Sequence, residues 1–97
     1  MATEFEARID TKFVFSAVCV EHGHSHSHHD GMLFLAHDVA LPETLRAYRK
    51  ASQKHGARPA QLIAIDALIH RVVAWQKAHP ATVKVADIDE EPGRKKP

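Results

Sequence analysis

The 97-residue chain has one cysteine, Cys19, so it can form neither an internal disulfide nor a metal site of paired thiolates. Any metal held by one chain is therefore expected to use nitrogen and oxygen ligands. Long apolar runs are also missing, since stretches such as residues 13–15 and 32–36 fall far short of the roughly 20 residues that cross a bilayer. The first residues include acids instead of a basic segment and an apolar run, which is unlike a secretory signal. We therefore expect a soluble, cytoplasmic protein that does not enter a membrane.

The overall composition is that of an ordinary globular protein. Apolar residues make up 44% of the chain and charged residues 26%, close to the usual proportions, which argues against general disorder. The last segment differs, because residues 87–97 are highly charged and almost without apolar side chains. The sequence thus predicts a single domain over residues 1–86, followed by a disordered charged tail over residues 87–97.

An alternating pattern in the first part of the chain indicates β-structure. From Phe5 to Cys19 the odd positions are mostly apolar, whereas the even positions are charged as far as Lys12. We expect strand structure over residues 3–20, with a buried odd face that includes Cys19 as a small core residue. The apolar run at residues 32–36 is the natural partner strand, and residues 21–31 would then form a long hairpin loop. A short third strand is expected near Val83 and Val85.

After Asp38 the apolar period becomes that of a helix. Pro42 is acceptable in a first helical turn and Gly56 ends the pattern, which predicts a helix over residues 42–55. Pro59 opens a second pattern that ends before Pro80, which predicts a helix over residues 59–79. The short connection forces the two helices into an antiparallel hairpin. The predicted fold is α+β, with a small two- or three-stranded antiparallel sheet, formed by a long N-terminal β-hairpin, packed on an antiparallel helical hairpin.

The most unusual stretch lies in the predicted loop, where five of the nine histidines fall within residues 22–29. In extended backbone alternate side chains share a side, so a His-x-His pair could reach one ion together with a further histidine or a carboxylate. The candidate ligands for zinc, nickel or copper are His22, His24, His26, His28, His29 and Asp30. Two other interpretations stay open: a solvated loop in which the histidines have no function, and a pH sensor in which clustered imidazoles become charged and repel one another.

The first predicted helix is basic. Residues 42–58 carry five basic side chains against Glu43 alone, while residues 1–31 carry five acidic side chains against two basic ones. The nucleic-acid or anion contacts would come from Arg46, Arg49, Lys50 and Lys54. A helix-turn-helix reader needs polar residues at the start of its second helix, and that helix is here the most apolar element of the chain. Nucleic acid is therefore an alternative partner, and a solvated charged face explains the same residues.

The second predicted helix is apolar around well over half of its circumference, which one neighbouring helix and a small sheet would struggle to cover. We therefore expect it to be buried partly against a second copy in a homodimer. No sequence motif of an enzyme is present around His37 and Asp38, and Asp38 is expected to brace the turn before the first helix. The predicted function is non-enzymatic binding or assembly, with transition-metal binding for storage, sensing or delivery as the alternative and nucleic-acid binding as the second alternative.

Overall fold

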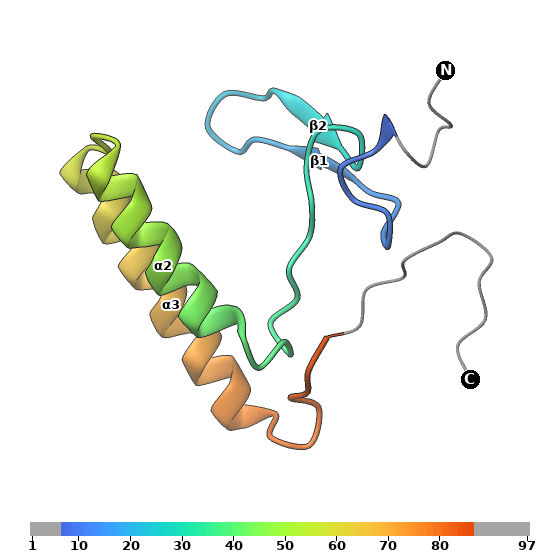
Figure 1. Ribbon diagram of the computed structural model, residues 1–97, viewed down its shortest axis with the longest axis vertical. Coiled ribbons are helices and arrows are strands. Elements are labelled where there is room, and N and C mark those ends of the chain that lie inside the picture. Colours follow the sequence, from blue (N-terminus) through green and yellow to red (C-terminus); the bar gives the residue numbers. More distant parts are fainter. Residues whose placement is uncertain (1–6, 87–97) are drawn as a thin grey trace. The chain divides into compact units, whose positions relative to one another are not determined.

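The computed structural model describes residues 7–86, which form two compact units. The single domain over residues 1–86 stays a prediction. The hairpin unit comprises the described residues up to Leu33, and the helical unit comprises Phe34–Ala86. A two-stranded antiparallel sheet and a pair of packed helices confirm the α+β class (Figure 1). The packing of the sheet on the helices stays a prediction, and the predicted tail at 87–97 lies outside the described residues.

The hairpin unit is built on two short strands, β1 (Ser16–Val18) and β2 (Ser25–Ser27). They pair antiparallel, with Ala17 opposite His26. Beyond the strands the backbone pairing continues, because Cys19 N–H donates to His24 O at 2.8 Å. The turn is closed by Gly23, whose N–H donates to Cys19 O at 2.8 Å and whose φ of +70° suits a residue without a Cβ. The connection is therefore a short turn.

The predicted strand bounds of 3–20 and 32–36 were wrong within the part of the chain that the structure describes. Only residues 16–18 of the first segment form a strand, and their partner lies at residues 25–27, inside the predicted loop 21–31. Residues 32–35 belong to no strand. A short loop costs less closure entropy than an 11-residue one, and the glycine at position 23 permits the tight turn. The apolar run at 32–36 was mistaken for the partner because the Ser-His alternation of β2 carries no hydrophobic signal.

Asp10 organises the backbone on the far side of the hairpin from the turn. This buried residue, 6% exposed, accepts hydrogen bonds at Oδ1 from the N–H groups of Lys12 and Phe13, both at 2.9 Å. Its Oδ2 accepts the N–H of Leu33, also at 2.9 Å. The backbone N–H groups of Ile9 and Asp10 donate to His28 O at 3.1 and 3.0 Å, respectively. The backbone here forms these bonds and not the predicted strand. Asp10 is buried, whereas Ile9, which was expected on the buried face, is exposed.

The helical unit contains α2 (Leu41–Lys54) and α3 (Pro59–Ala78), which lie side by side (Figure 1). The predicted bounds of 42–55 lie one residue later than those of α2 at both ends, and the predicted end at residue 79 lies one residue after that of α3. Before α2, Asp38 Oδ1 accepts the N–H of Ala40 at 2.9 Å, which confirms that Asp38 braces this turn. After α2, Gly56 adopts a φ of +87°, as is common where a helix ends in a glycine.

A small core and a set of polar contacts join the helices to their flanking segments. The buried apolar side chains of this unit are Leu41, Pro42, Ile65 and Val72. The Nε2 of Gln76, in α3, donates to the carbonyl oxygens of Ala36 and Asp38 at 3.0 and 2.8 Å. The predicted third strand is reduced to one parallel bridge between Asp38 and Lys84. Gln76 therefore holds the backbone of the segment before α2, and Asp38 of this segment also forms the bridge to Lys84.

Candidate functional site

The hairpin places three of the histidines along one face. Directly opposite residues of an antiparallel pair share a face, so His26 lies beside Ala17. The same register pairs Cys19 with His24 and Phe15 with His28, and backbone hydrogen bonds join both pairs. We call these six residues the histidine face; they are Phe15, Ala17 and Cys19 with His24, His26 and His28. Of the five clustered histidines, His26 lies within β2, His24 precedes this strand, His22 lies in the turn between the strands, and His28 and His29 lie in the turn that follows β2.

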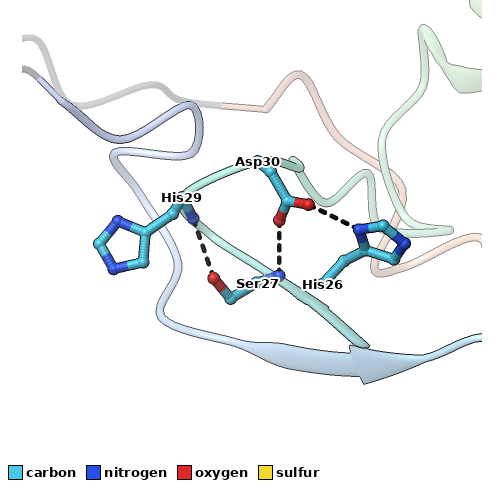
Figure 2. Close-up of polar contacts among 4 residues, drawn as sticks. All are labelled: His26, Ser27, His29 and Asp30. Atoms are coloured by element: carbon cyan, nitrogen blue, oxygen red, sulfur yellow. Dashed lines mark hydrogen bonds and ion pairs between the residues drawn. The ribbon is translucent and has the colours of Figure 1, made fainter. Parts of the chain in front are cut away.

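One histidine on this face is held by a carboxylate. His26 Nδ1 lies 2.6 Å from Asp30 Oδ2, and Asp30 Oδ1 accepts the N–H of Ser27 at 2.8 Å (Figure 2). The hydrogen bond from Ser27 N–H and then the contact with His26 hold the pKa of Asp30 below its ordinary value. An ionised carboxylate only accepts hydrogen bonds, so neutral His26 carries its proton on Nδ1 and presents an unprotonated Nε2.

The other predicted ligands are distributed around the hairpin. His22 and His24 stack with ring centroids 5.8 Å apart, and His22 Nε2 lies 3.8 Å from Glu21 Oε2. His28 packs edge-on to Phe15 and its Nδ1 lies 3.2 Å from Phe15 O. His29 donates its backbone N–H to Ser27 Oγ at 3.2 Å, while its ring points away from the pair formed by His26 and Asp30 (Figure 2). These contacts divide the predicted ligand set among several local environments.

The side chains as placed do not form a complete metal site. Over residues 7–86, no three or more histidine, cysteine, aspartate or glutamate side chains are grouped so that they could hold an ion. The closest association is the pair of His26 and Asp30, whose side chains are 57% and 53% exposed. Metal binding by His22, His24, His26, His28, His29 and Asp30 therefore stays a prediction, and it would require exposed side chains to rotate.

Cys19 is the residue of this face that the sequence interpretation assigned to the core. It is half-buried, and its backbone N–H bonds directly to its partner His24. The signal that would have revealed this pairing is the single glycine at position 23, which closes a short turn. A thiol thus lies across the sheet from an imidazole.

The predicted nucleic-acid contacts are exposed on α2, with one exception. Arg49 Nε forms an ion pair with Asp66 Oδ1 on α3 at 2.6 Å, so its charge is balanced within the helical unit. Arg46, Lys50 and Lys54 are exposed. Their spacing of four residues places them along one side of the helix, which is compatible with an anionic partner and equally with solvent. Nucleic-acid binding stays a prediction.

No family model, curated protein or solved structure matches this chain. Within residues 7–86, none of the helices is both long and apolar enough to cross a membrane.

Proposed function

We propose that the chain is a small non-enzymatic assembly module that forms a homodimer through its helical unit. The supporting observation is the exposure of apolar side chains in this unit. Four apolar side chains are buried, whereas seven large ones are exposed: Phe34, Leu35, Val39, Tyr48, Ile63, Leu68 and Val85. Domains of about 60 residues bury only about 60% of the surface that they expose when unfolded, so a unit with so small a core gains much from a partner. A second copy supplies that burial.

The geometry of α3 indicates which surface a second copy would cover. Ile65 faces the core, and Ile63, two residues earlier, is rotated by roughly 160° from it at 3.6 residues per turn. The Ile63 side chain is accordingly 67% exposed. Ala67 and Ala74 occur on the same outer side and would allow close approach of another helix. Contact centred on Ile63 would leave the packing of α3 against α2 intact.

Sedimentation velocity at micromolar concentrations tests the dimer. The wild-type chain should sediment as a dimer, and Ile63→Glu should weaken association at least about tenfold, because a carboxylate would be buried without a partner. Val14→Glu is the matched control, since Val14 is a similarly exposed apolar residue of the hairpin unit. It should remain dimeric. A wild-type monomer, or equal dimerisation by Ile63→Glu, would refute the proposal.

The second candidate function is transition-metal binding by the hairpin unit, and the contact of Asp30 with His26 favours it. Metal-bound histidines commonly donate their other ring N–H to a carboxylate, and His26 already has this arrangement. Zinc, nickel and copper all accept imidazole ligands. Titration of these ions into the wild-type chain and into a variant with His24, His26, His28 and His29 replaced by alanine tests the role. Equal binding by both chains would exclude this segment as the site.

A further inference from the structure

We propose that Cys19, His24 and His26 together bind a divalent transition-metal ion of the zinc type, with Asp30 as the positioning residue for His26. This inference rests on the second candidate function and names its ligands. The ligand set expected from the sequence contained only histidine and carboxylate side chains, whereas the set proposed here contains a thiolate. The observation that carries it is the backbone register of the hairpin, which places these three side chains on one face.

The register brings the three groups within reach of one ion. Cys19 lies opposite His24 and donates its N–H to His24 O, while Cys19 O accepts from Gly23 N–H, so the Cα atoms of Cys19 and His24 are neighbours across the hairpin, roughly 5 Å apart. His24 and His26 are two residues apart on the same strand face, a separation of roughly 7 Å between Cα atoms. Ala17, the residue opposite His26, is small and leaves space above the strands. An ion above the face could therefore contact one sulfur and two imidazole nitrogens.

Only side-chain rotations are required to complete the site. The backbone bonds that fix the register remain, and His26 and His24 are exposed, so their rings can turn toward an ion. Asp30 keeps its contact with His26 Nδ1 while Nε2 binds, so the carboxylate orients the ring without touching the metal. Because side-chain rotation costs entropy, the affinity should be lower than that of a preformed site.

The proposed ligand set has a defined chemistry. One thiolate and two imidazoles provide three of the four ligands of a tetrahedral zinc ion, and a water molecule would occupy the fourth position. When the bond from Cys19 Sγ to the metal forms, the thiol proton passes to solvent, and no electron is transferred. A thiolate favours zinc over ions such as magnesium and manganese, which prefer oxygen ligands.

Cobalt(II) is the suitable probe, because its tetrahedral complexes absorb in the visible and a thiolate ligand adds a charge-transfer band in the near ultraviolet. The experiment titrates Co²⁺ into the full reduced chain, without an affinity tag, and then displaces it with Zn²⁺. The wild-type chain should show both absorptions. Cys19→Ser should lose the charge-transfer band and bind at least about tenfold more weakly, and the double variant His24→Ala/His26→Ala should lose binding. Asp30→Asn should weaken binding about tenfold while retaining the band, as expected when the partner of a ligating histidine is removed.

His55→Ala is the matched control, because His55 is an exposed histidine of the helical unit that belongs to neither ligand set. It should bind cobalt as the wild type does. Binding with no charge-transfer band in the wild type, or an unchanged titration of Cys19→Ser, would refute the thiolate ligand and leave the histidine-based function standing. No binding by the wild-type chain would refute both. Circular dichroism of each variant identifies any loss of binding that results from unfolding.

Discussion

Asp10 is expected to be the most sensitive single position of the hairpin unit. Its buried carboxylate accepts three backbone N–H groups from two segments that are about 20 residues apart, Lys12 and Phe13 on one side and Leu33 on the other. Arg8 reinforces the first segment, since its guanidinium donates to Asp10 O and Phe13 O at 3.0 and 2.8 Å. Substitution of Asp10 should therefore release both segments at once.

The hydrogen bonds give the expected magnitude. In Asp10→Asn the amide oxygen can retain two of the donors, but its NH₂ group then faces the third, so one charge-assisted bond worth about 1.5–3 kcal/mol is lost. In Asp10→Ala all three donors lose their acceptor, at about 1–3 kcal/mol for each N–H left buried. The total for alanine is a large part of the 5–15 kcal/mol by which domains are typically stable. Alanine should therefore unfold the hairpin unit, and asparagine should weaken it.

Amide hydrogen exchange at neutral pH measures this effect residue by residue. In Asp10→Asn the N–H groups of Lys12, Phe13 and Leu33 should exchange about 10- to 100-fold faster, the ratio that corresponds to the lost bond. Amides within α3 should not change, because that helix belongs to the helical unit. Glu21→Gln is the control, since Glu21 is an exposed carboxylate of the same unit. Unchanged exchange of the three amides in Asp10→Asn would refute the reasoning.

Further predictions concern pH and the helical unit. Burial raises the pKa of Asp10, but its backbone hydrogen bonds and then the charge of Arg8 outweigh this effect and hold the pKa below its ordinary value. The stability that Asp10 contributes should therefore be complete above about pH 4 and lost as the pH falls further, as measured by acid titration of the hairpin amide signals. Ile65→Ala should lower the free energy of unfolding by about 2–5 kcal/mol in urea. Gln76→Glu should be more destabilising than Gln76→Leu, because a carboxylate would face the two carbonyl oxygens that now accept from Nε2. Arg49→Ala should cost less than about 1 kcal/mol, since its ion pair is partly exposed.

The helices could be predicted from the sequence because their boundaries carry local chemical signals. Proline stands at the start of both, and Gly56 occurs where a positive φ is needed. The strands could not, because β2 is built from serine and histidine and has no apolar alternation, whereas the apolar run at 32–36 mimics a strand. Asp10 was missed for a related reason: a charged residue in an alternating pattern is normally exposed, and only the fold shows that three N–H groups surround it.

Some histidines of the hairpin unit have a structural role, and others do not. His28 accepts the N–H groups of Ile9 and Asp10 at its backbone oxygen, and its ring packs on Phe15. The rings of His24 and His26 contact exposed side chains, His22 and Asp30, respectively. The bonds that hold β1 to β2 are backbone bonds, which any strand-forming residue could make. The stability of the hairpin should therefore survive replacement of both, and the cobalt experiment would then report on ligands and not on folding. Asp30 differs, since its Oδ1 also holds Ser27 N–H, so its substitution must be judged by circular dichroism as well as by affinity.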